Sequence, residues 1–161
     1  MAFLKLFANF LNMQEELEEQ MGYGFANIKP DIQTLAKNEI FVFGSNLAGR
    51  HGKGAALTAK RKFGAVYGQG VGFQGQSYAI PTKDKRLVVL PLTEISEYVK
   101  QFARFAESRQ DLEFYVTKIG TGLAGYNDES MARLFTCVEG LMNVHIPEDW
   151  IHILTKKPFQ P

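Results

Sequence analysis

The fold is decided by residues 40–55, Ile40-Phe-Val-Phe-Gly-Ser-Asn-Leu-Ala-Gly-Arg-His-Gly-Lys-Gly-Ala55. An apolar run of four residues stops at a Gly-Ser-Asn turn, a glycine-rich basic loop follows, and helical spacing then begins. Glycine lets a ligand approach the backbone closely, and the first turn of a helix offers unpaired N–H groups and the positive end of a dipole. The pattern predicts a strand, an anion-binding loop and a helix, which is how α/β proteins hold phosphorylated ligands.

A second junction of the same kind follows later in the chain. Glu113–Ile119 is predicted to be a strand, and Gly120-Thr-Gly-Leu-Ala-Gly-Tyr126 is a second glycine loop. Ligands of open α/β sheets bind outside the carboxyl ends of the strands. Two such loops on adjacent strands would surround a diphosphate with backbone N–H groups, so few charged side chains would be needed.

The other elements predicted along the chain alternate between strands and helices. Strands are expected at 77–82, 87–92 and 150–154, and helices at 54–64, 93–108 and from Asn127 to Met142. Thr93 is the expected N-cap of the second helix, and residues 32–37 are expected to form one helical turn. Alternation of this kind predicts an α/β fold with a mainly parallel sheet covered on both faces.

Two segments allow more than one interpretation. Residues 64–76 contain no charge and are rich in glycine, which fits a linker, but the apolar residues among them favour an ordered loop that runs close to another backbone or to a ligand. Residues 2–21 have the apolar spacing of an amphipathic helix, which we expect to pack on the domain. A partner helix or a membrane-surface helix is the alternative, although the acidic polar face speaks against a membrane.

Composition narrows the class of protein. The chain has 161 residues and a net charge of +1, so any anion site must be local, and a nucleic-acid partner is not expected. A single cysteine, Cys137, fits a reducing cytoplasm and is expected to be buried and inert. No apolar run is long enough to span a membrane, and the N-terminus lacks a secretory cleavage pattern, so a cytoplasmic protein is expected.

Several common sites are absent from the sequence. There is no GxxxxGK[ST] motif, no GxGxxG directly after the first strand and no GxSxG elbow around Ser45. The three histidines have no metal-ligand spacing, so neither a metal nor a cofactor is expected. Thr82, Lys83 and Asp84 could line the crevice but are expected to form an exposed turn. His145, His152 and Trp150 are expected to be structural, and Asp128 is expected to be a helix N-cap.

The two glycine loops together resemble the macro domain, a family that binds ADP-ribose. Ile40–Ala55 is similar to the first ligand loop of that family, and Ile119–Tyr126 resembles its second phosphate loop, Ser-Thr-Gly-Ile-Phe-Gly-Tyr. The Gly-Ser-Asn-Leu-x-Gly-Arg-His-Gly form is similar to a phage and bacterial branch of macro-like proteins. The resemblance covers roughly residues 28–155. It implies a three-layer α/β/α macro-like domain at 29–161, preceded by an N-terminal amphipathic helical extension at 1–28 that could bind a protein partner.

The resemblance also implies a ligand and the residues that bind it. The diphosphate would lie on Gly120, Thr121, Gly122, Leu123, Ala124, Gly125 and Tyr126, with Tyr126 near the distal ribose. That ribose would be bordered by Gly44, Ser45, Asn46, Gly49, Arg50, Gly52, Lys53 and Gly54, with Asn46 bonding its hydroxyls. Asp31 would take the adenine amino group, although Pro30 stands where the family has glycine.

The resemblance further implies a hydrolase that acts on ADP-ribose 1″-phosphate or on ADP-ribosyl derivatives. Arg50, His51 and Lys53 stand where typical members have small residues, which would favour an extra phosphate. Asn46 and His51 are the catalytic candidates, with His51 moving a proton. Two alternatives are a binding module without catalysis and, from a different class, an RNA-binding protein that uses the basic loop. His51 could instead only hold the turn through a backbone hydrogen bond.

Overall fold

The computed structural model describes residues 2–20, 26–27 and 32–156, and their elements follow the order expected for an α/β protein. The helices are α1 (Ala2–Gln20), α2 (Gly54–Lys62), α3 (Leu92–Ser108), α4 (Asp128–Leu134), the 3-10 helix η2 (Phe135–Val138) and α5 (Glu148–Thr155). The strands are β1 (Ala26–Asn27), β2 (Glu39–Asn46), β3 (Gly72–Gln74), β4 (Ser77–Lys83), β5 (Glu113–Val116) and β6 (Val144–Ile146).

The six strands form one sheet in the order β1-β6-β5-β2-β4-β3, and only β3 runs antiparallel to its neighbour. β2 lies between β4 and β5 and is parallel to both, with Phe41 opposite Ser77 on one side and Tyr115 on the other. β2 reads as a continuous apolar run because both of its faces are covered, as is usual in parallel sheets. The predicted mainly parallel α/β sheet is therefore confirmed.

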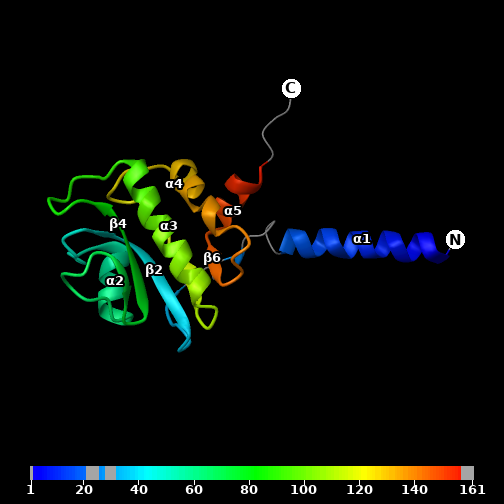
Figure 1. Cartoon of the computed structure of the whole chain (residues 1–161), viewed down its shortest axis with the longest axis horizontal. Helices are drawn as coiled ribbons and strands as arrows, with labels where there is room; N and C mark the ends of the chain where they lie inside the picture. The colour runs from blue at the N-terminus through cyan, green and yellow to red at the C-terminus, as the bar shows by residue number, and fades with distance from the viewer. Residues whose placement is uncertain (1, 21–25, 28–31, 157–161) are drawn as a thin grey trace, which may run out of the picture.

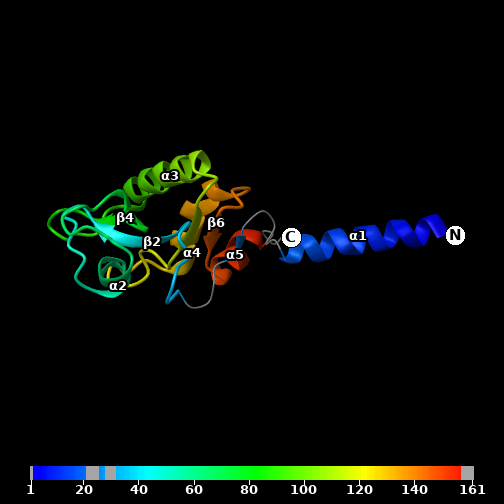
Figure 2. The ribbon, with the colours of Figure 1, turned by 90° about the horizontal axis from the view of Figure 1, so that it is seen from below.

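The helices cover the sheet on two sides, which gives three layers (Figures 1 and 2). On one face α3, α4 and α5 bury Ile40, Val42, Phe114 and Trp150 in the larger core. On the other face α2 packs Ala56, Ala59 and Phe63 against Phe41 and Phe43 of β2 in a smaller core. Alternate residues of β2 thus serve opposite cores, as the period of two in a strand requires.

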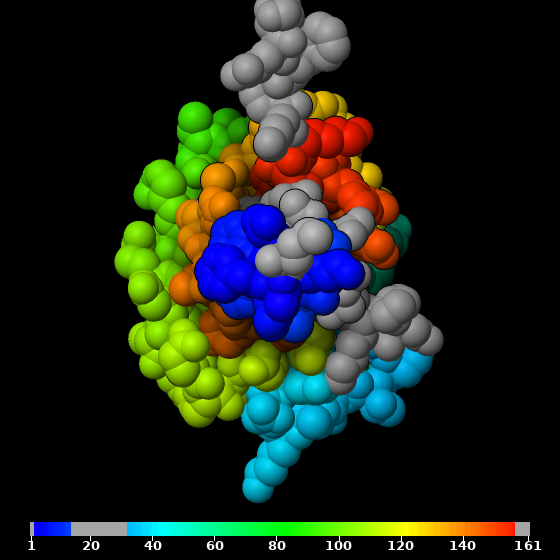
Figure 3. All heavy atoms as spheres, turned by 90° about the vertical axis from the view of Figure 1, so that its right-hand side faces the viewer, coloured from blue at the N-terminus to red at the C-terminus, as the bar shows by residue number. Residues whose placement is uncertain are grey.

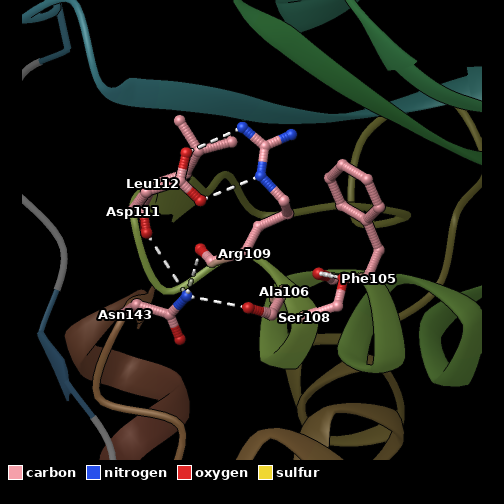
Figure 4. A network of polar contacts seen from close by, with 7 residues as sticks. All are labelled: Phe105, Ala106, Ser108, Arg109, Asp111, Leu112 and Asn143. Carbon is pink, nitrogen blue, oxygen red and sulfur yellow. Dashed lines mark hydrogen bonds and ion pairs between the residues drawn. The ribbon is translucent and has the colours of Figure 1, made fainter.

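A buried side-chain amide fixes the turn between α3 and β5 (Figure 4). The Nδ2 group of Asn143 donates to the backbone oxygens of Ala106, Arg109 and Leu112 at 2.9, 3.2 and 3.3 Å. Arg109 in the same turn makes a two-pronged ion pair with Asp111. The amide thus joins the end of α3 to the segment that leads into β6.

Two predicted strands have other structures. Residues 150–154 belong to helix α5, and the last strand is Val144–Ile146, which was expected to be a link. Short apolar runs do not distinguish strand from helix, and here Pro147 at the N-cap with two acidic residues in the first turn starts a helix. Residues 87–92 form no strand, because Asp84 binds the backbone N–H groups of Arg86 and Val88 in a tight turn and α3 begins at Leu92.

Smaller differences concern element ends. The strand at 113–119 ends at Val116, and the helix predicted from Asn127 to Met142 breaks into α4 and η2. Pro91, not Thr93, is the N-cap of α3, and residues 32–37 form no helical turn. Cys137 is exposed, not buried, because it lies on the short 3-10 helix and not on a continued α-helix.

The N-terminal helix exists as predicted but does not pack on the domain. It projects away from the sheet in Figures 1 and 2, and Figure 3 views it from its N-terminal end in front of the domain. Every residue from 2 to 13 is exposed, including Phe3, Leu6 and Phe7. The expected packing of this helix is therefore wrong for the residues whose side chains the structure describes.

Candidate functional site

The two glycine loops lie side by side at the carboxyl ends of neighbouring strands. β2 and β5 pair in parallel up to Val42 and Val116, so the first loop (44–54) and the second loop (120–126) leave the same edge of the sheet. A β-carbon placed on Gly44 would lie 3.4 Å from Ile119 Cγ2 and 3.7 Å from the Gly120 nitrogen. The two loops therefore begin next to each other.

Asn46 closes the first loop on itself. Its Nδ2 group donates to the Arg50 oxygen at 2.9 Å, and its Oδ1 atom accepts from the Arg50 N–H at 3.0 Å. An amide has one further donor hydrogen and one further acceptor lone pair. The main role of Asn46 is therefore to shape the loop. A ligand could use only its one remaining N–H donor and its one remaining acceptor lone pair.

His51 is completely buried, which argues against a role in proton transfer. Its Nε2 atom lies 3.1 Å from the Gln69 oxygen, and its ring meets Phe43 edge-on at 5.2 Å between centroids. Nδ1 is also buried and has no partner among the residues that the structure describes. A general acid or base must reach the reacting group directly or through one water. The geometry favours the alternative reading, in which His51 holds the turn.

The uncharged segment 64–76 is the support of the first loop. The Gly68 N–H donates to the Gly49 oxygen at 2.9 Å, and the Ser45 hydroxyl donates to the Gly70 oxygen. A β-carbon on Gly70 would overlap the Asn46 carbonyl. The prediction of an ordered loop close to another backbone is confirmed, and glycine is required at Gly70 because two chains touch there.

Two glutamines of this segment were missed by reasoning from the sequence. The Gln74 side chain donates to the Gln69 oxygen at 3.1 Å and accepts from the Val66 N–H at 2.8 Å, and it is buried. The Gln69 oxygen also faces His51. Gln69 and Gln74 had no distinctive pattern in the sequence, apart from the lack of charge around them.

Cations stand at the N-terminus of α2, where they are electrostatically unfavourable. Lys53 is the N-cap residue without a side-chain hydrogen bond, the first turn has no acidic residue, and Arg50 and Lys53 are both exposed. The N-terminus of a helix carries a partial positive charge, so cations there destabilise the helix unless an anion is nearby. The first loop thus has an exposed, electropositive part made of Arg50, Gly52, Lys53 and Gly54.

The second loop presents unpaired backbone donors. The Tyr126 N–H binds the Gly120 oxygen and the Gly125 N–H binds the Gly122 oxygen, both at 3.0 Å, which fold the loop into a tight turn. The N–H groups of Gly122, Leu123 and Ala124 donate to none of the residues that the structure describes. Unpaired N–H groups in a glycine turn form concave sites for anions.

Thr121 and Tyr126 are used to anchor this loop. The Thr121 hydroxyl donates to the Lys118 oxygen at 2.9 Å, and the Tyr126 hydroxyl donates to the Leu90 oxygen at 2.7 Å. Tyr126 is half-buried against the larger core. Its hydroxyl therefore ties the second loop to the connection between β4 and α3.

An ion-pair cluster fixes the start of the second loop. Lys118 Nζ lies 2.5 Å from Asp149 and 3.6 Å from Asp128, and Asp128 also accepts from the Trp150 indole at 2.8 Å. The hydrogen bond from Lys118 lowers the pKa of Asp149, and the same bond raises the pKa of Lys118. Asp128 is not the N-cap of α4, because Asn127 accepts from the Ser130 N–H and fills that role.

The remaining predicted residues lie as follows. Thr82 is buried on β4 and donates to the Ser45 oxygen at 3.4 Å, so it is not part of an exposed turn. His145 contacts Glu113 at 2.6 Å and stacks on Tyr115, and Trp150 is buried in the core. Asp31, the predicted adenine ligand, lies outside the described residues.

The described residues contain no group of three or more His, Cys, Asp or Glu side chains that could hold a metal ion. No helix within those residues combines the length and apolar content that crossing a membrane requires.

Comparison with known proteins supports the fold and not a function. No family model matches the chain, and no curated protein matches it. A solved structure described as a protein of unknown function from Bacteroides thetaiotaomicron is similar, with a TM-score of 0.54 and 17% sequence identity. The match covers 76% of this chain and 95% of the other. At this identity the similarity shows the α/β/α fold alone.

Proposed function

We propose that the chain binds ADP-ribose or a closely related nucleoside diphosphate between its two glycine loops. One observation carries the proposal: a β-carbon built on Gly44, near the end of β2, would lie only 3.4 Å from Ile119 Cγ2 and 3.7 Å from the Gly120 nitrogen, so the two loops begin side by side at the carboxyl edge of a parallel sheet. This edge is the usual ligand position in open α/β sheets. The resemblance of both loops to those of macro domains supplies the identity of the ligand.

Backbone donors of the second loop are available to a phosphate group. The unpaired N–H groups of Gly122, Leu123 and Ala124 face no acceptor among the described residues. Such groups bind phosphate oxygens without the desolvation cost of a buried cation. Arg50 and Lys53 of the first loop add positive charge at a helix N-terminus, where a phosphate would offset their unfavourable position.

Binding without catalysis is the function that this geometry supports best. His51 is buried and Asn46 is bonded to Arg50, so neither candidate presents a free reactive group. Hydrolysis of ADP-ribose 1″-phosphate or of an ADP-ribosyl derivative remains a prediction of the resemblance. Its specific support is the pair Arg50 and Lys53, which would suit a terminal phosphate.

Isothermal titration calorimetry with ADP-ribose tests the proposal. We expect saturable binding that is weakened about tenfold in the double variant R50Q/K53Q, since a hydrogen bond to a charged group contributes about 1.5–3 kcal/mol. K100Q/R104Q, which removes two exposed cations from α3, is the matched control and should bind like the wild type. The absence of heat at millimolar ADP-ribose would reject the proposal.

An assay of phosphate release distinguishes a non-catalytic binding module from a hydrolase. If the protein only binds, ADP-ribose 1″-phosphate should remain intact in the presence of stoichiometric protein. Turnover that disappears in His51→Ala, while ADP-ribose affinity and the melting temperature are retained, would restore the catalytic assignment of His51. Turnover that persists in this variant would assign the reaction to other residues.

A further inference from the structure

Positive and negative side chains are distributed unevenly along the chain, although its net charge is small. Residues 40–83 contain six Lys or Arg residues and no Asp or Glu. Residues 94–156 contain the same number of cations and ten acidic residues. The field that a partner meets depends on the local distribution of charge and not on its sum. The part of the domain around α2 is therefore basic, although the whole chain is almost neutral.

The cations of α2 gather on its exposed side. Ala56, Ala59 and Phe63 face the smaller core. At 100° per residue Arg61 lies opposite that buried face, with Lys60 and Lys62 on its two flanks, and all three are exposed. We call Lys60, Arg61 and Lys62 the basic face. In Figures 1 and 2, α2 lies at the end of the domain farthest from α1.

The residues that the structure describes do not neutralise the basic face. No acidic group among the described residues forms a salt bridge with Lys60, Arg61 or Lys62, and Lys62 donates to the neutral Gln33 side chain at 2.9 Å. Some cations elsewhere do have acidic partners, as in the pairs of Lys100 with Glu97 and Arg133 with Glu129.

Helix stability explains only part of this arrangement. Basic residues in the last turn of a helix interact favourably with its dipole, which accounts for the position of Lys60, Arg61 and Lys62. It does not account for the complete lack of acidic residues from 40 to 83, whereas a partner that is itself anionic does.

An aromatic ring stands beside the basic face. Tyr67 follows α2 and is 59% exposed, and Lys60 Nζ lies 4.9 Å from its ring centroid. Exposed aromatic rings next to cations provide stacking platforms for bases in single-stranded nucleic acids. Val66 is also exposed next to Tyr67, but α2 itself contributes no large exposed apolar side chain among the described residues that would extend an apolar contact with a protein or a lipid surface.

We propose that the basic face and Tyr67 form a binding surface for single-stranded nucleic acid. Lys60, Arg61 and Lys62 would contact phosphates, and Tyr67 would stack on a base. The surface recognises the backbone and any base, because stacking and phosphate contacts carry little sequence information. It lies outside the two glycine loops, so the inference does not depend on ADP-ribose binding.

Fluorescence anisotropy with a labelled 20-nucleotide single strand, as DNA and as RNA, tests this inference on the full chain. Three phosphate contacts predict a slope of about −2 for log affinity against log salt, which is roughly a twentyfold loss between 50 and 200 mM. K60Q/R61Q/K62Q should abolish most of this slope and weaken binding at least about tenfold at 50 mM salt. Tyr67→Ala should weaken binding about fivefold or more.

The control variant is K100Q/R104Q/R133Q, which removes the same number of charges from α3 and α4. It should retain the affinity and the salt slope of the wild type. The inference is overturned if the wild type does not bind the oligonucleotide at 50 mM salt, or if both triple variants lose equal affinity. It is also overturned if Tyr67→Ala binds like the wild type, or if vesicles containing phosphatidylserine compete with the oligonucleotide.

Discussion

At the scale of single residues, glycine is required where the 64–76 segment supports the first loop. A β-carbon on Gly70 would overlap the backbone carbonyl of Asn46, which cannot rotate away, whereas one on Gly52 would meet nothing within 4 Å. We expect Gly70→Ala to lower the free energy of unfolding by about 1–3 kcal/mol, the usual cost of overpacking. Gly52→Ala is the matched control and should stay within about 0.5 kcal/mol of the wild type. Urea denaturation measures both, and equal stability of the two variants would show that the segments separate easily.

Asn143 is the second residue with a large predicted effect. Its amide hydrogens serve three carbonyl oxygens in the turn between α3 and β5, and the residue is buried. We expect Asn143→Ala to destabilise the fold by about 1–3 kcal/mol, because the buried hydrogen bonds from its amide to three backbone oxygens are lost. Asn38→Ala, at an exposed position, should change stability little in the same urea titration. A nearly neutral Asn143→Ala would mean that water replaces the amide.

At the scale of elements, the Lys118 cluster joins the start of the second loop to α4 and α5 and makes this junction sensitive to acid. The pKa of Asp149 is lowered in the folded state, so its contribution to stability is present above its ordinary value of 3.8 and is lost as the pH falls through the lowered value. The unfolding free energy of the wild type should therefore fall more steeply below pH 4 than that of Asp149→Asn. Thermal melts between pH 2 and 7 measure this difference, and parallel curves would contradict it.

The elements also show where sequence patterns carry structural information and where they do not. Four elements could be predicted because their apolar pattern extends over many residues or because glycine marks their boundaries: helices 54–64 and 93–108 and strands 40–43 and 77–82. Residues 150–154 were misassigned because five apolar-rich residues fit either period, although Pro147 followed by two acidic residues is a signal for the start of a helix. The burial of His51 could not be predicted, since it depends on the distant Gln69 folding over the loop.

At the scale of the whole molecule, the domain and the N-terminal helix should differ in local stability. Val42 and Phe43 are fully buried on the strand between β4 and β5, whereas residues 2–13 of α1 are all exposed. Amides of β2 should exchange with solvent only through global unfolding, and those of α1 through local fraying, so their rates should differ by about a thousandfold or more. Hydrogen exchange followed by mass spectrometry measures this ratio. Comparable protection of α1 would show that its apolar side is covered in solution.

At Gly49, Gly68 and Gly70 the backbone of the first loop packs directly on the backbone of the 64–76 segment. Because the first loop rests on a second segment of backbone, its shape is set by contacts that no ligand has to create. A molecule that docks there loses little of its binding free energy to ordering the protein. Under the proposed function, exchange of the exposed side chains Arg50 and Lys53 should therefore change the affinity for the ligand, while the loop beneath them keeps its form.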